Sequence, residues 1–353
     1  SADCAGLPTI TARVCSQKIQ LGKGRWRFLT LLSGAAKMSE TSKFRSVFVS
    51  DLHLGYKGAD IRSLNMFLRA HTFRNLYLVG DILDGWKLEK RWYWCQDYSD
   101  FMDILIELEN RGVRITFLTG NHDEKLRQPA ACHYRPILLR QFGIRLAERV
   151  IHRTNDGRRL IVMHGDQFDG PLLRGASKRA DGLWSRLDKI SWARSKPSDL
   201  DGNGSRWSLG KAIATNAKSL IWSFTDTALR EAVRGGVDGI VCGHSHVAAV
   251  SSRGAHVFAN CGSWTGAREA GGHHTAVVER CNGTLELMKW PPMRPSRQDQ
   301  QSRTLSPDHP NTRSSKAAKL VRLVHRLWMP LHVDGAAPGF QLTTGYDATG
   351  ARR

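Results

Sequence analysis

The 353-residue chain has no closely paired cysteines, no long apolar run and no acidic excess. Its seven cysteines are odd in number and none stands in a C-x-x-C pair, which argues for reduced thiols and against a disulfide framework or a zinc ribbon. No apolar run approaches the roughly 18 residues that cross a bilayer. We therefore predict a cytoplasmic location, with peripheral contact at the inner membrane surface left open.

The chain carries a large surplus of basic residues. Its 52 Lys and Arg outnumber 32 Asp and Glu, for a formal net charge of +20. Such a charge favours polyanionic partners, among them anionic lipid and phosphorylated substrates, although surplus arginine in loops and tails is the simpler explanation. Because no recognised nucleic-acid-binding motif accompanies the charge, we expect no specific nucleic acid partner.

Composition divides the chain into three parts. Residues 1–44 read as an N-terminal extension in which KGRWRFLTLLSGAA imitates a signal peptide, but we expect translation to begin at Met38 and the residues before it to be partly non-native. Residues 45–290 form the main domain. Residues 291–353 are rich in Pro, Ser, Gln and Arg, which predicts a basic, largely disordered tail. Within this tail, KAAKLVRLVHRLW predicts a short amphipathic helix that either lies free or rests on an anionic membrane surface.

The main domain alternates short apolar runs with helical patterns. SVFVSDLHL, NLYLVGD and RITFLTGNHD read as strands, and the segments between them show helical spacing of apolar residues. This βαβαβ order predicts an α/β fold with a mainly parallel sheet. Between the later strands RRLIVMHGD and GIVCGHSH, a segment at about 169–236 that is rich in Trp, Lys and Arg predicts an inserted helical cap.

Five strand-like runs end in polar residues that can bind metal ions. Because open α/β sheets bind ligands beyond the carboxyl ends of their strands, these side chains should meet at one edge. Taken singly, each Asp could cap a helix and each His could be scaffolding, but together those explanations require five coincidences. The candidate ligands are Asp51, His53, Asp81, Asn121, His164, His244 and His246.

The chemistry of this set indicates two divalent ions. Carboxylate, imidazole and amide ligands suit Mn²⁺ or Fe²⁺, with Mg²⁺ and Zn²⁺ as alternatives, better than a thiolate zinc site. The ligands are too many for one ion and suit two ions that share a carboxylate, for which Asp81 at the tip of a central strand is the candidate. Two such ions would convert a bridging water into hydroxide near neutral pH and clamp a phosphoryl group. The residues therefore predict hydrolysis of a phosphoester without a covalent enzyme intermediate.

The order D-x-H, G-D-x-x-D, G-N-H-D, H-G-D and G-H-x-H resembles the calcineurin-like metallophosphoesterase superfamily over roughly residues 45–290. The resemblance implies a four-layer αββα sandwich with a helical insertion. It also implies that His122 stabilises the transition state or protonates the leaving group, with Asp84 or Asp123 orienting it. The implied ligands are Asp51, His53, Asp81 and His246 for the first ion, and Asp81, Asn121, His164 and His244 for the second.

The tract DGWKLEKRWYW, with SDLHLG before it and the insertion after HGD, resembles the UDP-2,3-diacylglucosamine diphosphatase branch of that superfamily. This resemblance implies hydrolysis of UDP-2,3-diacylglucosamine to UMP and 2,3-diacylglucosamine 1-phosphate in lipid A biosynthesis, by a peripheral membrane enzyme whose cap holds the acyl chains. The chain has GNHD where that branch has GNRD. The implied substrate contacts are Asn121, Lys211 and Lys218, together with Trp86, Arg91 and Trp92 at the substrate entrance.

Two alternatives remain open. The same chemistry could act on another nucleotide, as a phosphodiesterase or phosphatase. The chain could instead be a non-catalytic scaffold that keeps the fold but has lost its ions. The scaffold is disfavoured because every candidate ligand position holds a residue that can coordinate a metal.

Overall fold

The computed structural model describes residues 19–21, 25–27, 43–168, 223–265, 272–293 and 304–329. The chain divides into two units, Ser1–Thr41 and Ser42–Arg353. In the first unit, the short strands β1 (Ile19–Leu21) and β2 (Arg25–Arg27) pair in antiparallel register. The elements described below belong to the second unit.

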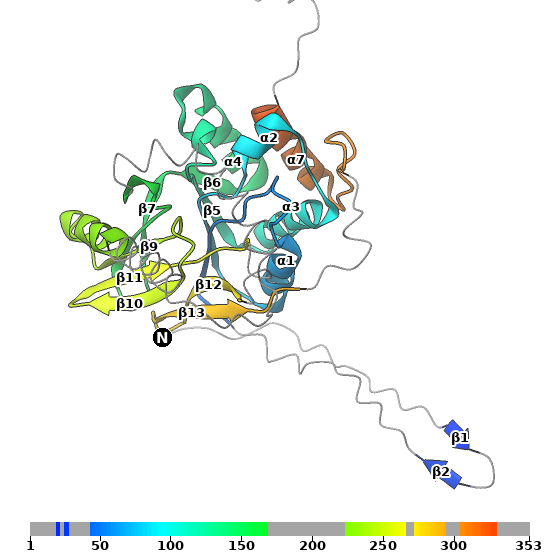
Figure 1. Ribbon diagram of the computed structural model, residues 1–353, viewed down its shortest axis with the longest axis horizontal. Coiled ribbons are helices and arrows are strands. Elements are labelled where there is room, and N and C mark those ends of the chain that lie inside the picture. The colour runs from blue at the N-terminus through cyan, green and yellow to red at the C-terminus, as the bar shows by residue number, and fades with distance from the viewer. Residues whose placement is uncertain are drawn as a thin grey trace, which may run out of the picture. The chain divides into compact units, whose positions relative to one another are not determined.

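The second unit contains a six-stranded sheet in the order β13-β12-β3-β4-β5-β6 (Figure 1). Neighbours from β3 to β6 are parallel, whereas β12 pairs antiparallel with both β3 and β13. The strands are β3 (Ser46–Val49), β4 (Asn75–Val79), β5 (Arg114–Leu118), β6 (Ile144–Ala147), β12 (His274–Glu279) and β13 (Leu285–Trp290).

A five-stranded sheet has the order β10-β11-β9-β8-β7. Its central strands β8, β9 and β11 are parallel, and the edge strands β7 and β10 are antiparallel to their neighbours. The mainly parallel arrangement predicted from the strand and helix order therefore holds in both sheets. The strands are β7 (Arg149–Arg153), β8 (Arg159–Met163), β9 (Gly239–Cys242), β10 (Ala249–Arg253) and β11 (His256–Asn260).

Several helix ends are capped by identifiable residues. Asp60 is the N-cap of α1, where its side chain accepts a hydrogen bond from the backbone N–H of Ser63. Gly143 ends α4 in the left-handed conformation that glycine adopts without strain. The helices are α1 (Ile61–Ala70), α2 (Gly85–Lys90), α3 (Gln96–Asn110), α4 (Tyr134–Phe142), α7 (Ser315–Trp328) and residues 223–234.

The two sheets pack face to face between helices. Phe48 of β3 belongs to a core shared with the five-stranded sheet, whereas its neighbours Val47 and Val49 belong to a core shared with α1, α3 and α7. A third core joins residues 223–234 to the outer face of β8 and β9. This helix, sheet, sheet, helix order confirms the predicted four-layer sandwich. The rest of the predicted cap, residues 169–222, lies outside the described residues.

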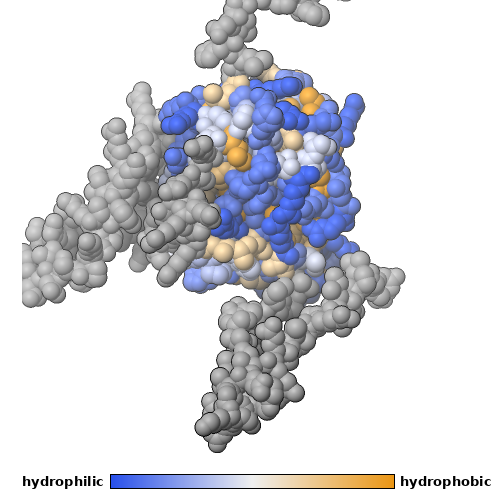
Figure 2. Space-filling model, turned by 90° about the vertical axis from the view of Figure 1, so that its right-hand side faces the viewer, coloured by the Kyte–Doolittle hydropathy of each residue, from blue (hydrophilic) through white to orange (hydrophobic). Residues whose placement is uncertain are grey.

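The C-terminal helix α7 is part of the core, which differs from the predicted disordered tail. Its N-terminus is fixed by Asp103 of α3, whose carboxylate accepts hydrogen bonds from the backbone N–H groups of Arg313 and Ser314. Figure 2, viewed from the side on which Figure 1 draws α1, α3 and α7, accordingly shows a largely hydrophilic face. No described helix is both long enough and apolar enough to cross a bilayer. The buried residues of α7 are Ala317, Leu320, Val321, Val324 and Trp328.

Aromatic residues after α2 hold the chain that leads into α7. The indole N–H of Trp92 donates to the carbonyl of Leu305 at 3.0 Å, and its ring stacks on Trp94 at 5.0 Å between centroids. The hydroxyl of Ser99 donates to the carbonyl of Pro310. Trp92 therefore packs against the C-terminal segment. Composition had indicated a solvated tail because the Pro, Ser and Gln around this short helix dominate the average.

Candidate active site

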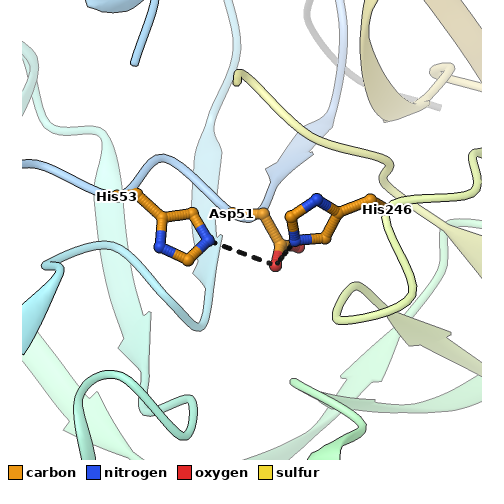
Figure 3. A group of neighbouring side chains, drawn as sticks. All are labelled: Asp51, His53 and His246. Atoms are coloured by element: carbon orange, nitrogen blue, oxygen red, sulfur yellow. Dashed lines mark ion pairs between the residues drawn. The ribbon is translucent and has the colours of Figure 1, made fainter. Parts of the chain in front are cut away.

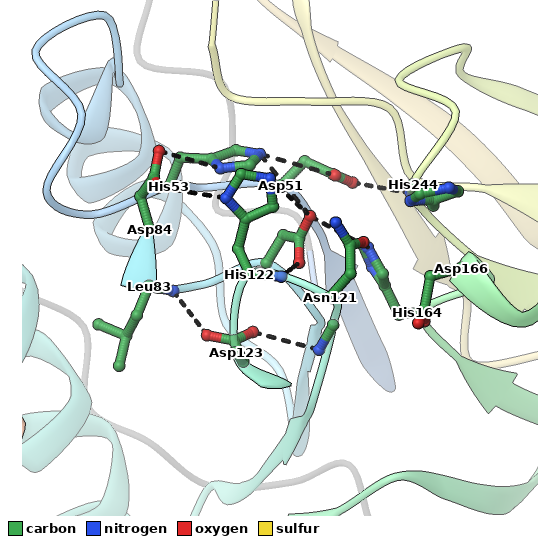
Figure 4. Close-up of polar contacts among 12 residues, drawn as sticks. Asp51, His53, Leu83, Asp84, Asn121, His122, Asp123, His164, Asp166 and His244 are labelled. Atoms are coloured by element: carbon green, nitrogen blue, oxygen red, sulfur yellow. Dashed lines mark hydrogen bonds and ion pairs between the residues drawn. The ribbon is translucent and has the colours of Figure 1, made fainter. Parts of the chain in front are cut away.

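The carboxyl ends of the parallel strands in both sheets carry the predicted ligands (Figure 4). In the six-stranded sheet, Asp51 follows β3, Asp81 follows β4 and His122 follows β5. In the five-stranded sheet, His164 follows β8 and His244 follows β9. Polar side chains from five strands are thus brought to one shared edge.

Asp51, His53 and His246 form a first group of side chains able to hold a metal ion (Figure 3). Oδ1 of Asp51 lies 3.0 Å from Nε2 of His246 and 3.9 Å from Nε2 of His53. Its Oδ2 accepts hydrogen bonds from the hydroxyl of Ser50 and from the backbone N–H of His244. One oxygen of Asp51 is therefore held by the protein while the other faces two imidazoles.

Asp81, His164 and His244 form a second group. Nε2 of His164 lies 3.2 Å from Oδ2 of Asp81 and 3.2 Å from Oδ1 of Asn121. Nδ1 of the same ring lies 3.0 Å from the carbonyl oxygen of Val79. A proton on Nδ1 that is donated to this carbonyl leaves Nε2 as the nitrogen able to bind an ion. Asn121 thereby joins the group as a further candidate ligand.

Asp81 lies between the two groups. Its Oδ2 is 4.0 Å from Nε2 of His53 on one side and 3.2 Å from Nε2 of His164 on the other. Its Oδ1 accepts a hydrogen bond of 2.8 Å from the backbone N–H of His122. Glycine at position 120 makes room for this carboxylate, since a Cβ on Gly120 would lie 2.1 Å from Oδ1 of Asp81. This is the position that a carboxylate shared by two ions requires.

Two buried polar atoms of the first group lack a hydrogen-bond partner among the described residues. They are Nε2 of His53 and Oδ1 of Asp51, whose ion-pair neighbour Nε2 of His246, at 3.0 Å, does not have hydrogen-bond geometry. Leaving such an atom buried and unsatisfied costs about 1–3 kcal/mol. A carboxylate oxygen and an imidazole nitrogen are both ligands of divalent transition metals, so an ion at this point would satisfy them. The residues present therefore fit a metal ion.

Backbone strain is concentrated at the same residues. Of the six non-glycine residues with positive φ in the described chain, five are candidate ligands, with φ between 50° and 67°. Residues held in this left-handed region cost of order 1–3 kcal/mol each and cluster at functional sites. The sequence SVFVSDLHL, which contains Asp51 and His53, had been interpreted as a single strand. Instead β3 ends at Val49, and the left-handed backbone turns the two side chains together.

The pKa values of the clustered groups reflect their proximity. Burial opposes ionisation of Asp51, but His246 and His164 lower its pKa to about 2. Burial also opposes ionisation of Asp81, and His164 and His122 hold its pKa well below the usual range. Burial lowers the pKa of His164, yet Asp81 raises it to about 10. Both carboxylates therefore stay ionised and supply negative charge that a divalent cation would neutralise.

His122 is oriented by Asp84. Its Nδ1 lies 3.1 Å from Oδ1 of Asp84, and its ring lies 3.8 Å from the ring of Trp86 between centroids. Asp84 is fully buried, caps α2 and also pairs with the amine of Lys87 at 2.8 Å. With Nδ1 occupied, Nε2 of His122 faces Asp81, whose Oδ2 is 4.0 Å away. The imidazole is thus aimed into the ligand cluster.

Asp123, the other acid predicted to orient His122, does a different task. Its carboxylate accepts hydrogen bonds from the backbone N–H groups of Ile82, Leu83 and Gly120. It therefore holds the loop after β4, which carries Asp81, against the loop after β5, which carries His122. Burial and the charge of Asp81 raise the pKa of Asp123 to about 7. The assignment of Asp123 as the orienting acid was wrong, since it braces the backbone.

The predicted substrate contacts divide into three cases. Trp86 lies beside the ligand cluster through its contact with His122. Arg91 is exposed at the end of α2, and its side chain makes no hydrogen bond or ion pair with the candidate ligands within the described residues. Lys211 and Lys218 lie outside the described residues. Of these four side chains, only Trp86 is therefore placed at the cluster by the structure.

One pair near the cluster was not identified from the sequence. The guanidinium of Arg127 forms two hydrogen bonds with the carboxylate of Asp166, at 2.6 and 2.8 Å, and donates to the carbonyl of Thr119. This pair joins the chain after β8 to the end of β5. The aspartate belongs to the quoted H-G-D motif, but no sequence pattern connects it with Arg127, because the two residues meet only across the two sheets.

Comparisons with known proteins agree with this geometry. Residues 44–248 match the model of the family described as calcineurin-like phosphoesterase. The chain is 26% identical over 179 residues to the UDP-2,3-diacylglucosamine hydrolase of Porphyromonas gingivalis, a match that covers 49% of this chain and 62% of that relative. The chain thus spans less than two thirds of the length of that relative.

Solved structures with a similar fold include a single mutant of Vps29 from Entamoeba histolytica and an archaeal phosphodiesterase. Each has a TM-score of 0.35 and 12% identity, and each match covers 69% of this chain and 98% of the other. The family model matches more than half of the present chain, including strands of both sheets and the ligand-bearing strand ends. The chain therefore belongs to the calcineurin-like phosphoesterase family.

Proposed function

We propose that the chain is a metal-dependent hydrolase that cleaves the diphosphate of UDP-2,3-diacylglucosamine to UMP and 2,3-diacylglucosamine 1-phosphate, a step of lipid A biosynthesis. The observation that carries the reaction class is the pair of ligand groups that meet at Asp81. The substrate is supported by the similarity to a relative named UDP-2,3-diacylglucosamine hydrolase. The same substrate would place the protein in the cytoplasm, in peripheral contact with the inner membrane surface.

The proposed cofactors are two divalent ions, with Mn²⁺ as the first candidate. Bound ions would supply the Lewis acidity that activates water and holds the phosphoryl group. Oxygen and imidazole donors suit Mn²⁺ and Fe²⁺, and neither group contains a thiolate. The proposed ligands are Asp51, His53, Asp81 and His246 for one ion, and Asp81, Asn121, His164 and His244 for the other.

His122 is proposed to donate a proton or a hydrogen bond to the phosphoryl group. Asp84 holds Nδ1, which leaves Nε2 as the atom that faces the cluster. Asp84 is in turn kept ionised, because hydrogen bonds from His122 and His53 outweigh burial and lower its pKa. Asp84 is thus a positioning residue for His122.

The substrate proposal is tested by UMP release. The full-length chain, loaded with Mn²⁺, is incubated with UDP-2,3-diacylglucosamine, and UMP is quantified by liquid chromatography. We expect metal-dependent release that is absent from the Asp81→Ala variant. Cleavage of an aryl phosphodiester without UMP release would retain the reaction class and reject the substrate. Failure on both compounds in metal-loaded protein would reject the proposed activity.

A second candidate substrate class is another nucleotide phosphodiester, and one observation favours it. The chain has His122 where the UDP-2,3-diacylglucosamine diphosphatase branch has arginine in the corresponding motif. Imidazole offers a single proton donor at Nε2 once Nδ1 is bound, whereas arginine offers a fork suited to two phosphate oxygens. The aryl phosphodiester arm of the experiment above separates these two candidates.

Replacing His122 with asparagine is expected to lower kcat by about 10²–10⁴-fold, the usual contribution of a positioned acid or base. Metal content, measured by mass spectrometry, should stay unchanged. The exposed His133 provides a matched control, since His133→Asn removes an imidazole away from the cluster. If the two variants had equal kcat values, the proposed role of His122 would be wrong.

A further inference from the structure

A cavity of about 630 Å³ lies at the end of the parallel strands that is opposite the ligand cluster. Its lining includes Asn75, Arg114 and Arg159, which are the first residues of β4, β5 and β8. The candidate metal ligands follow the last residues of the same strands. The length of the sheets therefore separates this cavity from the ligand cluster, and the reaction proposed above does not use it.

The lining of this cavity is strongly basic. It contains five arginines and no Asp or Glu. Arg45 forms an ion pair of 2.7 Å with Glu279, which is not itself part of the lining. The side chains of the other four have no carboxylate partner within the part of the chain that the structure describes. The arginines are Arg45, Arg114, Arg145, Arg153 and Arg159.

Such a group of like charges is unfavourable without an anion. Unit charges of the same sign repel, and low-dielectric concave walls strengthen their field. The same concentration of positive charge attracts a polyanion. The negative charges of the bound polyanion would take the place of the carboxylates that the cavity lacks. The arrangement thus has the electrostatic character of an anion-binding site.

The floor of the cavity orients two of the arginines. Oδ1 of the buried Asn75 accepts a hydrogen bond of 2.9 Å from Nε of Arg114. Nδ1 of the buried His152 lies 2.9 Å from the hydroxyl of Tyr77, and its Nε2 lies 2.9 Å from Glu279, the carboxylate that also holds Arg45. The guanidinium groups are therefore partly preorganised by buried residues, which reduces the entropy lost when they bind a ligand.

We propose that this cavity binds a small ligand that carries two or more phosphate groups. The planar guanidinium matches two phosphate oxygens at once, and five such groups exceed what a single phosphate can use. The volume lies within the range of about 300–1,000 Å³ that is typical of small-molecule sites. Two exposed apolar residues, Leu139 and Ile151, also line the cavity, so the phosphates can belong to a free molecule or to a lipid headgroup.

Isothermal titration calorimetry of the metal-loaded, full-length chain with inorganic tripolyphosphate tests the proposal. Because this probe can also reach the metal centre, each titration is repeated in an Asp81→Ala background. The cavity variant is Arg114→Gln with Arg145→Gln. The matched control is Arg69→Gln with Arg326→Gln, which removes the same charge from exposed arginines that lie outside the cavity. Thermal melting verifies that both double variants fold.

We expect the cavity variant to bind tripolyphosphate at least about 10-fold more weakly in both backgrounds, since a hydrogen bond to a charged group contributes about 1.5–3 kcal/mol. The matched control should differ from the parent by less than about twofold, as exposed charges contribute little. Equal affinities for the two double variants would overturn the proposal. A second double variant, Arg153→Gln with Arg159→Gln, removes charge from other residues that line the cavity and should show the same loss of affinity for tripolyphosphate.

Vesicle flotation then identifies the source of the phosphates. Phosphatidylcholine vesicles with and without cardiolipin, a lipid whose headgroup carries two phosphates, are compared for the same variants. Flotation that needs cardiolipin and is lost in the cavity variant assigns the site to a lipid headgroup. Tripolyphosphate binding without flotation assigns it to a free phosphorylated molecule. Neither result depends on turnover, so the outcome is independent of the proposed function.

Discussion

Replacing Asp81 with alanine is expected to abolish phosphoester hydrolysis and to leave at most one equivalent of bound metal. Asp81 is the side chain that lies between the two ligand groups, with His53 on one side and His164 on the other. Its removal would deprive both ions of a ligand and leave the imidazoles without the charge that holds them. A loss of several kcal/mol of transition-state stabilisation corresponds to a decrease in kcat of about 10³-fold or more.

Two further variants make this experiment specific. Asp81→Asn keeps the shape of the side chain but removes its charge, and we expect it to lose most of the activity and one of the two ions. Asp60→Asn alters another buried aspartate, one that caps α1 and pairs with His274 at 3.0 Å, outside the cluster. This control should keep two equivalents of metal, measured by mass spectrometry. Turnover at the parent rate in Asp81→Ala would show that the metal centre has been misassigned.

The second large effect is expected on stability. Trp328 is 1% exposed in the core formed with α1 and α3, and its ring lies against α2, where a Cβ on Gly85 would come within 2.4 Å of it. Trp328→Ala should lower the free energy of unfolding by about 3–5 kcal/mol, the usual cost of truncating a buried Trp. The exposed Arg326 on the same helix provides the control, since Arg326→Ala should change the free energy of unfolding by less than about 0.5 kcal/mol. Urea unfolding measures both values.

Deletion of residues 304–353 should have a larger effect than the point variant. Five buried side chains of α7 would be lost from the core, and the apolar surface of α3 that they cover would face water. At about 2–5 kcal/mol for each large side chain, the total approaches the whole stability of a typical domain, about 5–15 kcal/mol. We therefore expect no cooperative unfolding transition from the truncated chain. A truncated chain that melts like the parent would show that α7 is dispensable for folding.

Much of the candidate site can be predicted from the sequence, because its ligands lie in local sequence order directly after apolar strands. The runs ending in Asp51, Asp81 and His164 each form a buried strand, and parallel pairing brings their carboxyl ends to one edge. The helical spacing before β4 likewise predicts α1, whose Ile61 and Phe67 are buried. These features depend on periodicity, on strand polarity and on the ligand chemistry of each side chain, all of which are properties of short segments.

Only the tertiary structure decided which acid acts on which partner. Asp84 and Asp123 both stand a few residues beyond a strand, and their spacing does not distinguish them. The choice depends on how the loop after β4 packs beside the loop after β5, where Asp84 meets the imidazole of His122 and Asp123 meets three backbone N–H groups. The left-handed backbone at the ligands also depends on these packed loops, because an isolated peptide would avoid it.

The packing of α7 and the presence of the arginine cavity were also decided by tertiary structure, because both depend on contacts between distant segments. The apolar face of α7 was visible in the sequence, but its partner α3 lies some two hundred residues earlier, so composition alone indicated a tail. The cavity collects arginines that stand at or beside the ends of separate strands, and Arg45 and Arg114 are distant in sequence from the other three. Short segments of sequence thus determined the strands, the helical periodicity and the ligand chemistry. Only the packing of distant segments determined which groups meet, because those contacts are non-local.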